Sequence, residues 1–482
     1  SATKMQLSDL STIFRDQETA APPEIYRRVE VFLNALAAIP KKRWRPHFNS
    51  QGIRVEGPGL ARMERLLERL ALSFQGTKII RVVGTSGKGS TSLMIAESLQ
   101  AAGRPTAAFF SPNVTSLAER FWIRGALADA GAAGRAAARV ADVAAAMAKE
   151  DEVGPPSFFE SSLALLLVAA GEEGCEYIVL EAGLGGTYDA TNAVGPGVLE
   201  VITPIGLDHT DLLGDTIGRI ARDKAGIITP GGRVITAPLA PEAENEVVVA
   251  ARERNAERHR SPEVAGFEMD EAGCLFDLDF GGNEIWEGVR TQMIGAHQAM
   301  NATLAAGACH LLGVGEADIR TGLYVARLPC RIERMPGEPA VILDGAHNRD
   351  KARALVDSLT AWPLSRRLFV LGAIGDKDYL GLAEELAGQG ERFFVTAPPG
   401  GAPRPGLAPG KFARALRDAG AARVSEFLDP WQAFEVALRV AGEDDLVIVA
   451  GSLYLAGEFR KKWVGEELII ETGTPFPPEV WV

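Results

Sequence analysis

The sequence predicts a two-domain α/β protein with parallel sheets and crossover helices. Strand-like and helix-like segments alternate through much of its 482 residues, which is the pattern of βαβ units. That length exceeds the usual size of one hydrophobic core, so more than one domain is expected. The segment Arg327–Pro339 is rich in proline and glycine and has the composition of a linker. We therefore place a boundary near residue 335, which gives predicted domains 1–335 and 336–482.

The first predicted domain contains most of the alternating segments. Strands are expected at residues 78–83, 106–110, 177–181, 199–205 and 233–237. Helices are expected from their periodicity at residues 90–102, 135–149, 158–170, 215–227 and 296–312. Residues 262–292 differ, because short alternating segments are broken by Gly281 and Gly282, and this favours a small antiparallel excursion.

The second predicted domain is a smaller, Rossmann-like α/β unit. Its strands are expected at residues 341–344, 368–373, 393–396 and 446–450, with amphipathic helices between them. Residues 398–409 are rich in glycine and proline and are expected to form an exposed loop.

Charge and composition argue against several classes of protein. The formal net charge is −13 and no dense Lys/Arg run occurs, so no nucleic-acid partner is expected. The longest apolar run, Leu163–Ala170, is too short to cross a bilayer, and the polar segment Ser1–Asp16 does not resemble a signal peptide. The four cysteines are far apart and lack a CxxC pair, which predicts reduced thiols in a cytoplasmic protein.

A glycine-rich segment, Val82–Thr91 (VVGTSGKGST), follows one predicted strand and opens a predicted helix. Small residues there let backbone N–H groups approach phosphate oxygens, and a helix N-terminus adds positive potential. The Walker spacing puts a glycine six residues before the lysine, where this chain has Val82. The segment is therefore a variant phosphate loop. Its candidate ATP-binding residues are Gly84, Thr85, Ser86, Gly87, Lys88, Gly89, Ser90 and Thr91.

Two alternatives remain open at this point. A glycine-rich strand–helix junction also occurs as a purely structural turn. A phosphate loop alone is compatible with a kinase, an ATPase or a ligase. In each of these enzymes Lys88 would contact the β and γ phosphates, and Ser90 or Thr91 would bind Mg²⁺.

Further sequence motifs along the chain narrow the choice between a kinase, an ATPase and a ligase. The loop GTSGKGST is similar to the GTNGKGST of folylpolyglutamate and dihydrofolate synthases, which belong to the Mur ligase superfamily, and Gly89 after the lysine favours this branch. Other segments resemble that family in the same order, and the ordered set is specific although each block alone is weak. These segments are Ser111-Pro112-Asn113 with Glu119-Arg120, Ser157–Glu160, Leu180–Gly186 with Asp189–Asn192, Ile202–Ile228, His297-Gln298 with Asn301-Ala302, Leu343–Asn348, Gly375–Asp378 and Gly451–Leu455.

The resemblance implies a P-loop ATPase domain of the Mur-ligase type and an ATP-dependent amide ligase. In the implied reaction, ATP activates a carboxylate as an acyl phosphate, ADP is released, and the amine of an amino acid such as L-glutamate attacks. Such catalysis rests on charge neutralisation and alignment. The implied magnesium ligands are Ser111, Glu181 and His209, with Ser90 near the phosphates. Glu181 is alternatively a satisfied strand-end carboxylate, and His209 a structural histidine.

Lys224 matches a family lysine that is carbamylated. A carbamate turns a cation into an oxygen-rich anion suited to a second magnesium ion. The alternative is an ordinary lysine on a helix surface.

The remaining implied residues lie near the predicted boundary and beyond it. By resemblance, Gln298, Asn301 and Arg331 bind nucleotide and phosphate, although Arg331 is alternatively a linker salt bridge. Asp344 and His347, which follow a predicted strand, and Ser452 are implied to contact the incoming amino acid and, for Asp344, the nucleotide. Asp344 and Asn348 are alternatively helix N-caps.

Departures from the family pattern leave the acceptor open. Asn113 replaces the family's histidine, Tyr188 follows Thr187 where the family has Arg-Leu, and Arg349 replaces its proline. Cys330 stands where the family has glycine, and the stretch Lys41–Gly59 is longer and more basic than expected. The first hypothesis is a folylpolyglutamate synthase, with or without dihydrofolate synthase activity, that uses ATP, Mg²⁺ and glutamate. The second is the same ligase with a non-folate carboxylate acceptor, and the third is a degenerate ATP-binding regulator. A monomer that closes about the linker is the family expectation.

Overall fold

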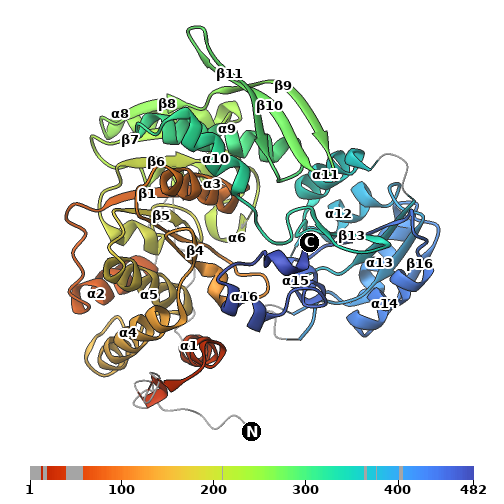
Figure 1. The fold of residues 1–482 in the computed structure, drawn as a ribbon, viewed down its shortest axis with the longest axis horizontal. Helices are drawn as coiled ribbons and strands as arrows, with labels where there is room; N and C mark the ends of the chain where they lie inside the picture. The colour runs from red at the N-terminus through yellow and green to blue at the C-terminus, as the bar shows by residue number, and fades with distance from the viewer. Residues whose placement is uncertain are drawn as a thin grey trace.

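The computed structural model describes residues 12–14, 19–39, 58–208, 210–362, 366–375, 377–400 and 405–481 (Figure 1). The predicted mixed α/β fold with parallel sheets is confirmed. An eight-stranded sheet forms an N-terminal lobe and a six-stranded sheet forms a C-terminal lobe. The basic stretch Lys41–Gly59 lies outside the described residues up to position 57.

The N-terminal sheet has the strand order β4-β3-β2-β5-β1-β6-β7-β8. Strands β2, β5, β1, β6, β7 and β8 run parallel, and β3 and β4 add antiparallel hairpin strands at one edge. Their bounds are β1 Lys78–Val83, β2 Thr106–Phe109, β3 Phe121–Ile123, β4 Ala126–Leu127, β5 Tyr177–Glu181, β6 Leu199–Ile202, β7 Arg233–Thr236 and β8 Glu257–Arg260.

Helices cover both faces of this sheet, because side chains alternate between its faces along each strand. In β1, Ile79 packs into a core with α1, α4 and α5, whereas Ile80 packs into a core with α3, α9 and α10. The helices of this lobe are α1 Pro22–Ala37, α2 Pro58–Arg69, α3 Lys88–Ala101, α4 Ala130–Glu150, α5 Phe158–Glu172, α6 Thr210–Leu213, α7 Ile217–Ala225, α8 Pro241–Glu253, α9 Ala296–Leu311 and α10 Glu316–Val325. The single helix expected at 215–227 is thus preceded by a separate short helix, α6.

The antiparallel excursion predicted for residues 262–292 is confirmed. Strands β9 (Glu263–Asp270), β10 (Gly273–Gly281) and β11 (Glu284–Thr291) form a three-stranded antiparallel sheet whose hairpin projects from the molecule in Figure 1. The turn between β10 and β11 holds Gly281 and Gly282, both with positive φ.

The C-terminal sheet has the strand order β12-β13-β17-β14-β15-β16, with only β12 antiparallel to its neighbour among the described strands. Its strands are β12 Glu333–Met335, β13 Ala340–Leu343, β14 Arg367–Leu371, β15 Arg392–Val395, β16 Val424–Glu426 and β17 Leu446–Ala450. Its helices are α11 Arg349–Ser358, α12 Tyr379–Leu386, α13 Pro409–Asp418, α14 Pro430–Val440, α15 Leu453–Arg460 and α16 Glu466–Thr472. Pairing within this sheet therefore begins at Glu333, and a domain boundary at residue 335 stays a prediction.

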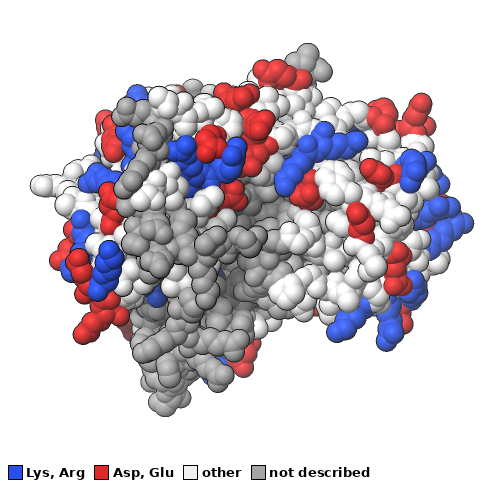
Figure 2. Space-filling model, turned by 90° about the horizontal axis from the view of Figure 1, so that it is seen from below, with Lys and Arg blue, Asp and Glu red and all other residues white. Residues whose placement is uncertain are grey.

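The chain returns to the N-terminal lobe after α15. Helix α16 contacts α1, and the Leu127 N–H donates to the Gly473 carbonyl at 2.8 Å, so the C-terminal segment bridges both lobes (Figure 1). Figure 2 shows Lys and Arg interspersed with Asp and Glu on the face it draws, without a field of one sign. In the described part of the chain, no helix is long and apolar enough to cross a membrane.

Candidate active site

The phosphate loop connects β1 to α3 and requires glycine at two positions. Gly84 has φ of +155° and Gly87 has φ of +86°. A Cβ at Gly84 would lie 1.8 Å from Thr203 Oγ1, and a Cβ at Gly87 would lie 2.2 Å from Asn301 Oδ1. Both positions are therefore closed to side chains by neighbouring groups as well as by backbone conformation.

Two lysines meet at the start of this loop. Lys88 Nζ donates to the Gly84 carbonyl at 3.3 Å, and Lys224 Nζ donates to the same oxygen at 2.8 Å. Lys224 is only 4% exposed, which contradicts the alternative of a helix-surface lysine. Burial, reinforced by the charge of Lys88, lowers the pKa of Lys224 to about 7, although Asp223, Asp208 and Asp189 oppose the shift. A small cavity of about 30 Å³ lies between these lysines and Gly183–Gly185.

Oxygen donors stand at the carboxyl ends of the neighbouring strands. Strands β1, β5 and β2 are adjacent and parallel, so the phosphate loop, Glu181 and Ser111 share one edge of the sheet. Glu181 Oε2 accepts a hydrogen bond from the Ser111 N–H at 2.9 Å. Burial raises the pKa of Glu181, and nearby Lys88, the Ser111 N–H, Arg331 and Arg120 oppose that rise.

The chemistry of this donor set fits Mg²⁺. A carboxylate and a hydroxyl residue are hard oxygen donors, and Mg²⁺ usually binds through one or two carboxylates together with substrate phosphates and waters. No cluster of three or more His, Cys, Asp or Glu able to hold a metal occurs among the described residues. Gly89 occupies the position where phosphate loops usually carry a hydroxyl residue, and Ser90, Thr91 and Ser111 are the hydroxyl residues predicted near the phosphates.

His209 lies outside the described residues, so its role as a metal ligand stays a prediction. Its neighbour Asp208 is described and forms an ion pair with Lys377 of the C-terminal lobe at 3.2 Å. Asp208 therefore links the N-terminal lobe directly to the second lobe.

The residues predicted to bind nucleotide come together beside the phosphate loop. Gln298 and Asn301 are buried in the first turns of α9, and Asn301 Nδ2 donates to Gln298 Oε1 at 3.0 Å. This orientation points Asn301 Oδ1 at Gly87. Arg331 lines a cavity of about 330 Å³ with Gly89, Ser111 and Glu181. Arg331 Nη1 donates to the Cys330 carbonyl at 3.2 Å, and Arg331 forms no linker salt bridge with another described residue.

Asp344 follows β13 and is almost fully buried. Its Oδ2 accepts from the Ile332 N–H at 3.0 Å and its Oδ1 from the Ala346 N–H at 2.7 Å. Burial raises its pKa, and Arg331 has the strongest opposing effect. The N-cap of α11 is Asn348, whose Oδ1 accepts from the Lys351 N–H at 3.0 Å. The N-cap alternative thus holds for Asn348 and is wrong for Asp344.

His347 is held in a defined tautomer. Its Nδ1 lies 2.9 Å from the Gly345 carbonyl and its Nε2 lies 3.1 Å from Lys351 Nζ. Because a carbonyl only accepts and an ammonium only donates, Nδ1 carries the proton and Nε2 is the acceptor. Burial and the Lys351 charge lower the pKa of His347, so the ring is neutral.

Ser452 is the N-cap of α15 and accepts from the Tyr454 N–H at 3.2 Å. It follows β17, which pairs with β13, and the preceding Gly451 N–H donates to the Ala346 carbonyl at 2.7 Å. Ser452 and Asp344 therefore lie at the same edge of the C-terminal sheet.

Sequence reasoning missed several charged residues at this site. Asp208 and Lys377 lay in blocks that had been noticed without a role, and Lys351 gave no signal because only folding places it against His347. Arg120 was also noticed only as part of a block. It is buried, with its pKa lowered to about 10 by that burial, and its Nε donates to Asn113 Oδ1 at 2.8 Å.

The other departures have visible contacts. Arg349 stands in the first turn of α11 and pairs with Glu384 of α12, so it ties two helices on the surface. Cys330 is fully buried and has φ of +53°, a left-handed conformation that explains why glycine suits this position. All four cysteines are free.

Comparisons with known proteins agree with this arrangement. The Mur ligase middle domain matches residues 82–309, and the Mur ligase glutamate ligase domain matches residues 330–453. The chain is 32% identical over 423 residues to a dihydrofolate synthase/folylpolyglutamate synthase of Bacillus subtilis, covering 84% of this chain and 95% of the relative. A similar enzyme of Escherichia coli is 28% identical over 419 residues, covering 87% and 94%.

Solved structures are similar over nearly the whole chain. Mycobacterium tuberculosis folylpolyglutamate synthase, complexed with ADP and AMPPCP, has a TM-score of 0.81 at 26% identity and covers 92% of this chain and 99% of its own. Escherichia coli FolC, in complex with DHPP and ADP, has a TM-score of 0.77 at 26% identity and covers 90% and 97%.

Proposed function

The chain belongs to the folylpolyglutamate synthase/dihydrofolate synthase family of the Mur ligase superfamily, and on that premise we propose that it joins L-glutamate to a folate-type carboxylate. It is an ATP-dependent, ADP-forming ligase. One observation supports the site assignment: the phosphate loop, Ser111, Glu181 and Lys224 meet at one sheet edge, and Arg331, whose charge acts on Asp344, lines the same cavity as Ser111 and Glu181.

In this proposal the N-terminal lobe activates the acceptor. Backbone N–H groups of residues 84–90 hold the phosphates, and Lys88 exchanges its contact with the Gly84 carbonyl for phosphate oxygens. Glu181, Ser111 and Ser90 would hold Mg²⁺, which would supply charge neutralisation at the phosphates. The acceptor carboxylate attacks the γ-phosphorus, and the acyl phosphate and ADP are formed.

The C-terminal lobe then presents the amino acid. Lys351 and Lys377 place positive charge beside His347 and Asp208, which suits an amino acid with a second carboxylate. Arg331 and Asp344 bind the nucleotide, and Ser452 adds a polar group at the same edge. The amine attacks the acyl carbon, the amide forms and phosphate leaves.

We also propose that Lys224 is carbamylated. Its Nζ is buried beside the phosphate loop, and its lowered pKa of about 7 leaves a substantial share of the amine neutral near pH 7, as carbamate formation requires. A carbamate there, together with His209, would supply oxygen and nitrogen donors for a second metal ion. We further propose a cytoplasmic monomer, in keeping with the four free cysteines.

A second candidate keeps the ligase and changes the acceptor. It is favoured by Asn113, which binds Arg120 in the loop after β2 where the family pattern has histidine. A changed partner for a buried arginine next to Ser111 alters the polar groups available to an acceptor.

One assay separates these candidates. Phosphate release from ATP is measured with dihydropteroate, tetrahydrofolate and other carboxylic acids, each with and without glutamate. Turnover that needs both a folate and glutamate supports the first candidate. Turnover only with another acid supports the second, and no turnover with any acceptor contradicts both and favours an ATP-binding regulator.

A further inference from the structure

We propose that Arg460 and Glu333 act as a positioning pair that sets Arg331 and Asp344 relative to the loop carrying Ser111. This inference rests on the proposed function, because it assumes that those three residues serve the nucleotide site. It adds a role for two residues that do not themselves line that site.

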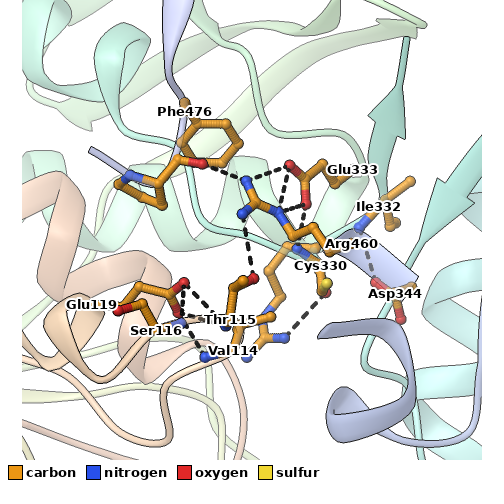
Figure 3. Close-up of polar contacts among 12 residues, drawn as sticks. Val114, Thr115, Ser116, Glu119, Cys330, Ile332, Glu333, Asp344, Arg460 and Phe476 are labelled. Atoms are coloured by element: carbon orange, nitrogen blue, oxygen red, sulfur yellow. Dashed lines mark hydrogen bonds and ion pairs between the residues drawn. The ribbon is translucent and has the colours of Figure 1, made fainter. Parts of the chain in front are cut away.

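The pair is buried. Arg460, the last residue of α15, is 0% exposed and Glu333 is 6% exposed. Arg460 Nε donates to Glu333 Oε2 at 2.9 Å and Nη2 donates to Oε1 at 3.0 Å, a bidentate arrangement (Figure 3). The remaining guanidinium N–H groups reach the Thr115 hydroxyl at 3.4 Å and the Pro475 carbonyl. One side chain thus contacts the linker, the N-terminal lobe and the C-terminal segment.

On the linker side, the pair holds a tight turn. Glu333 Oε2 also accepts from the Cys330 N–H at 2.9 Å, while the Ile332 N–H donates to Asp344 (Figure 3). Cys330 and Ile332 have φ of +53° and +52°, which is strained for residues with side chains. The turn keeps this conformation only while its contacts hold, and Arg331 lies within it. Loss of the Glu333 contact therefore releases Arg331 and the Asp344 bond together.

On the opposite side, α15 sits directly on the loop that follows Ser111. A Cβ at Gly457 would lie 2.6 Å from the Val114 carbonyl, and Arg460 lies one turn further on the same helix face. Glu119 stiffens this loop, because its carboxylate accepts from the N–H groups of Val114, Thr115 and Ser116 (Figure 3). Arg460 therefore couples a rigid loop in one lobe to a strained turn at the start of the other.

Stability alone does not require charges here. Apolar residues of similar volume commonly replace a buried ion pair with equal or greater stability, whereas removal of one partner leaves a buried unpaired charge. A double apolar replacement consequently separates the two roles: it restores burial without restoring the directional bonds to Cys330, Thr115 and Pro475.

The test compares Arg460→Lys, Glu333→Gln and the double variant Arg460→Met with Glu333→Met. Binding of AMPPCP is measured by calorimetry, together with kcat and KM for ATP, while melting temperature reports folding. The matched control is Asp445→Asn, which breaks another bidentate pair, with Arg366, at the amino-terminal ends of the central strands β17 and β14. Nucleotide binding needs no acceptor, so this readout survives even when the acceptor assignment fails.

We expect AMPPCP affinity and kcat/KM for ATP to fall about tenfold in the double variant, measured at a temperature where its melting curve shows it fully folded. We expect Arg460→Lys to bind more tightly than the double variant, because it keeps one bond to Glu333. The control should lower the melting temperature without changing affinity. Wild-type affinity and kcat/KM in the folded double variant would overturn the proposal.

Discussion

Lys224 donates a hydrogen bond to the carbonyl oxygen of Gly84 across 140 residues of sequence, at 2.8 Å. The contact brings a buried amine from α7 to the first residue of the phosphate loop. A Cβ at Gly186 would clash with the Lys224 carbonyl. Glycine there lets the segment that follows Glu181 pack closely against the backbone of Lys224 in α7. These contacts connect the phosphate loop, Glu181 and Lys224, which is the proposed site of carbamylation.

Carbamylation of Lys224 predicts a response to bicarbonate. With its pKa lowered to about 7, the amine is largely charged at pH 6 and largely neutral at pH 8, so carbamate forms more readily as pH rises. Enzyme depleted of carbon dioxide should gain activity with bicarbonate at pH 8 and gain much less at pH 6. Lys224→Ala should show a kcat lower by about a hundredfold and no bicarbonate response. A variant as active as the wild type would rule the role out.

The close approach of Asn301 to Gly87 predicts a steric effect on nucleotide binding. In Gly87→Ala the new Cβ would meet Asn301 Oδ1 at 2.2 Å, so the loop or Asn301 has to move. Gly103 has a similarly positive φ, of +70°, but no atom within 4 Å of a new Cβ. Gly103→Ala therefore controls for backbone strain alone. We expect KM for ATP to rise about tenfold in Gly87→Ala and to stay unchanged in Gly103→Ala, as measured by phosphate release. Equal KM values in the two variants would show that the close contact with Asn301 does not affect ATP binding.

Glu97 predicts a pH-dependent stability. It lines the larger cavity. Burial raises its pKa to about 7, although a hydrogen bond from Trp122 opposes that rise. The folded protein keeps a proton that the unfolded chain has released, so this group's contribution to stability is present below about pH 4.5 and is lost as pH rises through 7. Glu97→Gln should stabilise the protein by about 2 kcal/mol at pH 8, with little effect at pH 5.

The control for that change is Glu268→Gln, since Glu268 is exposed in β9. Urea unfolding at both pH values gives the comparison. An equal change at pH 5 and pH 8 would show that Glu97 does not titrate as burial requires.

The left-handed backbone at Cys330 predicts an unusual order of stability. Alanine keeps the strain of φ +53° and loses the buried sulfur, whereas glycine loses the sulfur and relieves the strain. We therefore expect Cys330→Gly to be more stable than Cys330→Ala by about 1 kcal/mol. Thermal or urea unfolding measures the difference. The reverse order, which helices and strands normally show, would contradict the backbone conformation.

Sequence patterns predicted the parts of the site that depend on local chemistry. The phosphate loop and Ser111 follow buried strands and Glu181 ends one, and the ends of adjacent parallel strands meet at one edge of a sheet. The fold class, the antiparallel excursion at residues 262–292 and the N-cap at Asn348 were predictable for the same reason, since periodicity and capping are properties of short segments.

Contacts between distant segments were not predictable. Asp208 meets Lys377 only because the two lobes pack against each other, and Arg460 meets Glu333 only because α15 packs beside β12 within the C-terminal lobe. A single sequence carries no signal for such packing. Likewise, the departure at Cys330 was visible in the sequence, but its left-handed conformation depends on Glu333 and Gly345, whose bonds close the turn.

The central claim is that ATP activates an acceptor carboxylate as an acyl phosphate before the amide forms. It is tested most directly with a folate-type acceptor whose reacting carboxylate carries heavy oxygen, incubated with ATP, Mg²⁺ and glutamate. Mass spectrometry then follows the label in the products. We predict one labelled oxygen in each released phosphate and a product lengthened by one glutamate per ADP formed. Unlabelled phosphate, or phosphate release that does not depend on the acceptor, would contradict it.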